Sequence, residues 1–335
     1  RGLRFQTSDG VGCESCHGPA SAWLTTHYAV GGTHAANVAR GLVPLENPRA
    51  RAGQCLNCHF GSADPGQFVT HRIMAAGHPR ISFELDLFST LQQHHNPDRD
   101  YAGRKGAADG TRMWAIGQAM ALERSLSLFA TGLGTEGIFP EFYFFDCHSC
   151  HRQISDDPRF RPSAAANPGR PIPSGMPPYN DENMIMLAAA ARVVAPALGA
   201  RFERDSRAFH LAMAQGRAPA VAAAATLRAS ARALADAFAA APMGRPTTFA
   251  IVDTITSQAV SPRFTDYAGS VQAVMATDTL LSALVNQGHV PLAAANNIRV
   301  DINSAYRAVH DPNSYDPGSF RASLGRAAAA IRRLR

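Results

Sequence analysis

Hydrophobic residues recur at helical spacing throughout the second half of the chain. They predict helices that begin after Asp181, span 219–241 and 266–287, and start again after Asp316. Gly288 follows the third stretch and an Asp-Pro pair opens the last, as is typical of helix ends and helix starts. This half is rich in Ala and contains no cysteine. We therefore predict an α-helical bundle here.

The pattern is less regular before residue 155. Apolar residues at helical spacing are confined to short stretches, such as 20–28 and 81–93, and to one longer segment at 111–133. Short helices and long loops are expected. Residues 156–180 contain seven prolines, which resist helix and sheet alike. The chain is therefore predicted to be mainly α with little β: a loop-rich domain at 1–155, a Pro-rich linker at 156–180 and a helical domain at 181–335.

Composition narrows the classes of function. The chain has 335 residues, of which 46% are hydrophobic and 17% charged, so it can form real cores and is not a disordered protein. The formal net charge is +6, but the basic residues are scattered arginines and Lys105 is the single lysine, which argues against nucleic-acid binding. Arg192 and Pro196 interrupt the best apolar stretch, so no transmembrane segment is predicted.

The cysteines carry the strongest signal in the sequence. All six fall into C-x-x-C pairs, and a histidine directly follows each pair: Cys13, Cys16 and His17; Cys55, Cys58 and His59; Cys147, Cys150 and His151. C-x-x-C-H is the spacing of covalent haem attachment, in which two thiols form thioethers with the vinyl groups and the histidine becomes the proximal iron ligand.

Two other uses of C-x-x-C pairs fit less well. Three C-x-x-C pairs cannot be divided evenly among zinc sites that each use four thiolates. Such sites also do not require a histidine after each pair. Thioredoxin-like dithiols need a βαβ context, which the sequence does not predict at any of the three pairs. The motifs therefore predict three covalently attached haem c groups with their iron.

The first motif also indicates a family. The segment Gly10-Val-Gly-Cys13-Glu-Ser-Cys16-His17-Gly18-Pro19-Ala20 resembles the G-x-x-C-x-x-C-H-G-P segment of multihaem c-type cytochromes, including the tetrahaem cytochromes of nitrifying bacteria. Segments 67–71 and 76–80 are similar to those that follow the second site in such proteins. The resemblance spans about residues 5–155 and implies haem attachment outside the cytoplasmic membrane, hence a periplasmic or extracellular location.

This chain departs from the tetrahaem pattern because it holds three sites. It opens at Arg1 without a leader segment, so we expect a processed start, from which an export signal or a further haem site has been removed.

The spare histidines determine what the iron can do, because an electron carrier needs a sixth ligand and a catalytic haem leaves that position open. The candidates are His27, His71, His78, and one of the adjacent His94 and His95, with His95 favoured because Pro97 follows. His78 is expected past a helix end, between Gly77 and Pro79. A surface role is predicted for His148, a structural or solvated role for His210, His289 and His310, and a core role for Met74, Met113 and Met120. Arg72, Arg80 and Arg112 are candidate partners of haem propionates.

Three functions fit these observations. The first is a multihaem cytochrome that passes single electrons to or from a redox protein partner, with at least two bis-histidine irons. The second is a haem enzyme in which one five-coordinate iron acts on a small nitrogen or sulfur compound. The third is a haem-carrying subunit of a larger electron-transfer complex or of a homo-oligomer. The first is favoured, which makes an electron-transfer protein the expectation rather than a catalyst.

Overall fold

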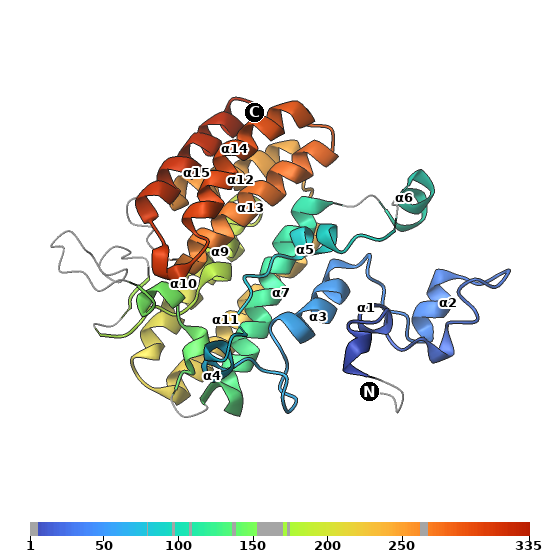
Figure 1. Ribbon diagram of the computed structural model, residues 1–335, viewed down its shortest axis with the longest axis horizontal. Coiled ribbons are helices and arrows are strands. Elements are labelled where there is room, and N and C mark those ends of the chain that lie inside the picture. Colours follow the sequence, from blue (N-terminus) through green and yellow to red (C-terminus); the bar gives the residue numbers. More distant parts are fainter. Residues whose placement is uncertain are drawn as a thin grey trace.

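The chain folds into α-helices, as a computed structural model shows (Figure 1). The residues described here are 6–78, 80–95, 98–106, 109–135, 139–152, 170–172, 175–261 and 267–335. Within them lie fourteen α-helices, several 3-10 turns, and a single isolated β-bridge, between Phe145 and Tyr179. The predicted mainly α fold with little β is confirmed.

The second half forms a bundle of long helices. They are α9 (Glu182–Val194), α10 (Pro196–Met213), α11 (Arg217–Ala240), α12 (Arg245–Ala259), α13 (Tyr267–Asn286), α14 (Leu292–Ala308) and α15 (Pro317–Arg332). The stretches predicted at 219–241 and 266–287 correspond to α11 and α13. The Asp316 carboxylate accepts hydrogen bonds from the backbone N–H groups of Gly318 and Ser319, so α15 begins where the Asp-Pro pair predicted.

Helix α7 (Gly110–Ala130) joins the first half of the chain to this bundle. It packs against α9, α11 and α13 on one side and against α3 and α5 on the other. Such a helix must be apolar nearly all round, and its rare polar groups need partners. The buried Gln118 amide donates to Gln272 at 3.1 Å and accepts from Asn183 at 2.7 Å. The division into domains stays a prediction, since α7 precedes the Pro-rich segment yet packs within the bundle.

The first half contains short helices joined by loops, as predicted. They are α1 (Glu14–His17), α2 (His34–Ala39), α3 (Pro48–His59), α4 (His71–Ala75), α5 (Leu85–Leu91) and α6 (Arg99–Lys105). The helical prediction for 20–28 is wrong beyond a 3-10 turn at Ala20–Ala22. The Thr26 hydroxyl hydrogen-bonds to the Trp23 carbonyl and to the Asn37 amide oxygen, and such side-chain bonds compete with helix formation.

The connection between the halves is described only in part. Most of the predicted linker at 156–180 lies outside the described residues. Its end is held in place, because Arg170 forms an ion pair with Asp181 and both side chains are buried. In the described part of the chain α13 alone is long and apolar enough to cross a membrane, but 78% of that apolar window is buried inside the protein. Helix α13 therefore packs as a core helix.

Candidate functional site

Each C-x-x-C-H motif folds into a single helical turn. Cys13 precedes α1, Cys55 and Cys58 lie in the last turn of α3, and Cys147 begins the 3-10 helix η5 (Cys147–Ser149). The backbone N–H of His17 donates to the Cys13 carbonyl at 2.9 Å, and that of His151 donates to the Cys147 carbonyl at 2.8 Å. Positions i, i+3 and i+4 of a helical turn share one face. Both thiols and the imidazole of a motif are thus placed on the same side of the backbone.

The thiols remain unpaired with one another. All six cysteines are free of disulfide bonds. Burial raises the pKa of the Cys55 and Cys147 thiols above the usual value. Thiol–disulfide exchange uses the thiolate, which a raised pKa disfavours at these two cysteines.

At the first motif, His17 faces the two adjacent histidines that follow α5. Its ring centroid lies 6.1 Å from that of His94 and 6.0 Å from that of His95. The nearest ligand nitrogens of the three side chains all lie within 4.8 Å of one another. Burial, reinforced by the positive charges of His95, His94 and Arg51, lowers the pKa of His17. A lowered pKa favours the neutral imidazole, which is the form that binds metals.

At the third motif, His151 is opposed by His71, eighty residues earlier in the sequence. The two ring centroids are 6.0 Å apart. His71 is the first residue of α4, and its backbone N–H donates to the carboxylate of the buried Glu141 at 2.7 Å. Because Glu141 lies just before the motif, this bond docks the start of α4 beside η5. The structure therefore brings the predicted ligand His71 to a proximal histidine.

The spacing of these histidines can be compared with that of two imidazoles on one metal. Bonds of about 2 Å from a metal to imidazole nitrogen place two opposed ligand nitrogens about 4 Å apart. The nitrogens around His17 all lie within 4.8 Å of one another, which is compatible with this separation. The residues at the first motif thus fit a group whose metal is bound by two imidazoles, and at the third motif a second imidazole lies 6.0 Å from the His151 ring, centroid to centroid.

The second motif has a different environment. His59 is half-buried, stacked on Phe83 at 5.2 Å and in edge contact with Phe88 at 5.1 Å. In the described part of the chain, neither ring contact of His59 involves another histidine. Burial lowers the pKa of His59 and favours its neutral form. The residues fit a haem with one axial imidazole and an apolar surrounding.

Two predicted ligands are not brought to a proximal histidine in the described residues. His27 is exposed, its Nδ1 lies 2.5 Å from the Leu24 carbonyl oxygen, and its ring contacts are with Trp23 and Tyr28. His78 is exposed and lies beyond the end of α4, where Gly77 was expected to place it. An iron-ligand role for these two residues stays a prediction.

The structure corrects the prediction for His148 and agrees with the structural alternative for His210. His148 is not a free surface group, because its Nδ1 lies 2.6 Å from the Pro312 carbonyl oxygen and its ring packs on Tyr315. These contacts dock the third motif on the bundle. His210 is buried as a structural histidine, and its Nε2 lies 3.4 Å from the Asp181 carboxylate, a partner that sequence spacing did not reveal.

Arg80 and Arg112, two candidate partners of propionates, donate hydrogen bonds to carbonyl groups of the protein. Arg80 donates to the backbone carbonyls of Tyr143 at 2.5 Å and Phe145 at 3.5 Å, and it lies 3.7 Å from the Cys147 sulfur. Arg112 donates to the Ala241 carbonyl at 3.1 Å. Arg80 therefore braces the segment that leads into the third motif.

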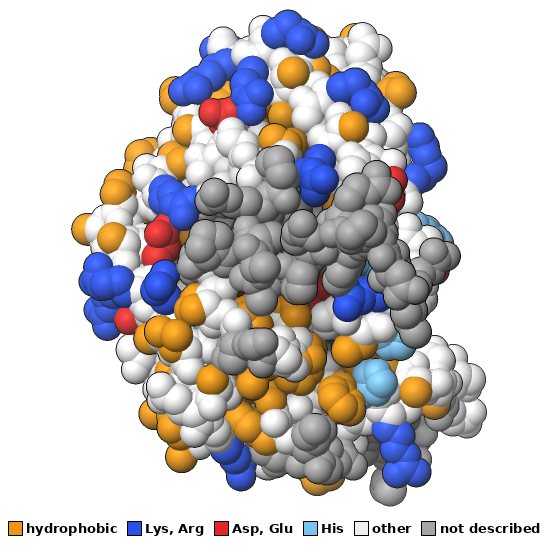
Figure 2. Space-filling model, turned by 90° about the vertical axis from the view of Figure 1, so that its left-hand side faces the viewer, with side chains coloured by type: hydrophobic (Ala, Val, Ile, Leu, Met, Phe, Trp, Pro, Cys, Tyr) orange, Lys and Arg blue, Asp and Glu red, His pale blue; other side chains and the backbone are white. Residues whose placement is uncertain are grey.

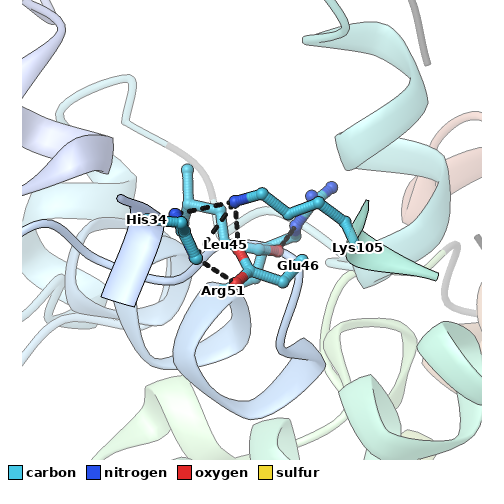
Figure 3. Close-up of polar contacts among 5 residues, drawn as sticks. All are labelled: His34, Leu45, Glu46, Arg51 and Lys105. Carbon is cyan, nitrogen blue, oxygen red and sulfur yellow. Dashed lines mark hydrogen bonds and ion pairs between the residues drawn. The ribbon is translucent and has the colours of Figure 1, made fainter. Parts of the chain in front are cut away.

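The single lysine has a role that the sequence did not indicate. Lys105, at the end of α6, approaches the His34 ring nitrogens at 2.8 and 3.0 Å and the Glu46 carboxylate at 3.6 Å (Figure 3). His34 itself lies 2.5 Å from Glu46. Arg51 of α3 donates to the Leu45 carbonyl at 2.6 Å. This cluster ties α2, α3 and α6 together around the first motif.

The first two motifs lie side by side. The Gln54 side chain of α3 donates to the Ser15 carbonyl at 2.9 Å, which fixes the second motif beside the first. On the face shown in Figure 2, Lys and Arg side chains are scattered among other types. No family model, no curated protein and no solved structure matches this chain. The likeness to multihaem cytochromes therefore rests on the three motifs and their surroundings.

Proposed function

We propose that this chain is a multihaem c-type cytochrome of the periplasm or cell exterior, which passes single electrons through three covalently attached haems to or from a redox protein partner. The observation that carries the proposal is that two of the C-x-x-C-H histidines lie close to histidines from distant parts of the sequence. His17 meets His94 and His95, and His151 meets His71. An iron with two histidine ligands requires a second histidine close to the proximal one, and two of the three motifs have such a neighbour.

The residues have separate tasks in this proposal. The three cysteine pairs would hold the haems through thioethers, and His17, His59 and His151 would be the proximal ligands. When bound, each haem supplies an iron that accepts and returns one electron. His71 would supply a second imidazole at the third motif, and His94 or His95 would supply one at the first. Close contact between the first two motifs favours transfer between neighbouring haems.

A second candidate function rests on the second motif. In the described part of the chain, the ring contacts of His59 are with Phe83 and Phe88, so a haem held there would have His59 as its one protein ligand, in an apolar environment. An open position is what a haem enzyme uses to bind a small molecule. This alternative gives the chain one catalytic haem next to two electron-carrying haems.

Intact mass and optical spectra of the purified, exported protein test the first proposal. The expected mass is that of the polypeptide plus three haems, and replacement of both Cys55 and Cys58 by Ala should remove one haem of the three. A Ser15→Ala variant is the matched control, because its side chain lies between two attachment cysteines without being one. A colourless protein with the mass of bare polypeptide, or one that carries zinc, would refute the proposal.

Carbon monoxide separates the two candidates. Binding of one equivalent per reduced chain, lost when Cys55 and Cys58 are replaced, would support an open second site. If the three-haem protein bound no carbon monoxide, the enzyme candidate would be refuted and electron transfer would be the remaining function.

A further inference from the structure

We propose that His94 and His95 are interchangeable sixth ligands of one iron, the iron held by His17. This inference rests on the proposed function, because it assumes haem at the first motif. It goes further by assigning two ligands, rather than one, to a single axial position. The two side chains would alternate there, with His94 bound in the resting state.

The first argument is distance. The His94 and His95 rings lie 6.1 and 6.0 Å from the His17 ring, so neither is favoured by proximity. Their own centroids are 4.2 Å apart. Ligand nitrogens of all three residues fall within 4.8 Å of one another. An iron at His17 is thus within reach of either imidazole, although only one can occupy the position at a time.

The second argument is hydrogen bonding, which selects the resting ligand. Nδ1 of His94 lies 2.9 Å from the Gln92 carbonyl oxygen. A ligating histidine usually donates its other ring N–H to a carbonyl, which fixes the tautomer and orients the free nitrogen toward the metal. No ring hydrogen bond of this kind is made by His95 in the described residues. The geometry therefore favours His94, whereas the sequence favoured His95.

The third argument is the local backbone. Both histidines are exposed and lie outside any helix, between the end of α5 and the start of α6. Glu84 caps the start of α5, and Lys105 holds the end of α6 against His34 and Glu46. The helices before and after the pair are thus each held by other parts of the protein. A small backbone rotation at the pair itself would replace one imidazole with the other and keep both near His17.

Single and double variants of the three-haem protein test the exchange. We expect His94→Ala to retain a low-spin first iron with an altered electron paramagnetic resonance signal, because His95 takes its place. His95→Ala should retain the original signal. The double variant should gain one high-spin iron and bind one more equivalent of carbon monoxide per chain than the parent. His289→Ala, an exposed histidine in the cysteine-free half, is the matched control.

The outcomes distinguish this inference from the proposed function. If His94→Ala or His95→Ala alone produced the high-spin iron, one residue would be the sole ligand and exchange would be refuted. A double variant with unchanged spectra would place the ligand elsewhere and also refute it. In both cases three haems per chain would leave the proposed function standing. A polypeptide without haem would instead overturn the proposed function.

Discussion

Deprotonation of Glu84 should weaken the fold as the pH rises. The Glu84 side chain is 1% exposed and caps α5 by accepting the backbone N–H groups of Asp86 and Leu87 at 2.8 and 2.7 Å. The Thr279 hydroxyl of α13 donates a third bond at 2.9 Å. Burial, with a smaller contribution from the charge of Asp86, raises the pKa of Glu84 from 4.5 to about 7.

The size of the effect follows from this shift. The native carboxyl holds its proton up to a higher pH than the unfolded one, so its contribution to stability is fully present below pH 4.5 and is lost as the pH rises through about 7. Each pKa unit corresponds to about 1.4 kcal/mol, so the shift corresponds to a loss of about 3 kcal/mol in the free energy of unfolding. Asp86, whose pKa burial raises to about 6, should lose stability in the same direction.

Guanidinium unfolding of the haem-loaded protein, followed by far-UV circular dichroism at about pH 5 and about pH 8, measures this loss. Glu84→Gln keeps an oxygen acceptor and cannot ionise, so it should reduce the difference between the two pH values by about 3 kcal/mol. Asp236→Asn, at a side chain that is 74% exposed, is the control and should leave the difference as it is. An equal pH dependence in Glu84→Gln and in the parent would refute the reasoning.

Three further predictions concern other parts of the molecule. Under the proposed function, His71→Ala should convert the iron held at the third motif to a high-spin form that binds carbon monoxide, whereas His78→Ala should not. Optical titration with carbon monoxide measures both variants, and equal effects would argue against His71 as a ligand. Arg80→Met removes donors to the Tyr143 and Phe145 carbonyls and should lower the free energy of unfolding in guanidinium by about 1 to 3 kcal/mol. Arg72→Met, at an exposed side chain, should lower it by less than about 0.5 kcal/mol. Equal losses in the two variants would argue against a bracing role for Arg80. Asp316→Ala removes the cap of α15 and should cost about 1 kcal/mol, an effect that Asp316→Asn should largely avoid; a loss of the same size in both would contradict capping.

Local sequence predicted most of the helices because their apolar spacing and caps are local properties. Helix α15 begins at the residue that follows Asp316, and α11 lies within a few residues of the predicted 219–241. The helix prediction for 20–28 was wrong because the Thr26 hydroxyl hydrogen-bonds to Asn37, eleven residues away. Hydrophobic periodicity contains no information about such a contact. The placement of α7 against the bundle depended likewise on distant partners such as Gln272.

The sequence by itself determined the local arrangement of each motif: two thiols and an imidazole at i, i+3 and i+4 share one face of a helical turn wherever that turn forms. Only the tertiary structure decided which distant histidine meets which motif. His71 lies beside His151, where Glu141 accepts a hydrogen bond from the first residue of α4, and the His94–His95 pair lies beside His17 just after α5, which Glu84 caps. Spacing along a chain sets local geometry, whereas contacts across tens of residues depend on how separate helices pack.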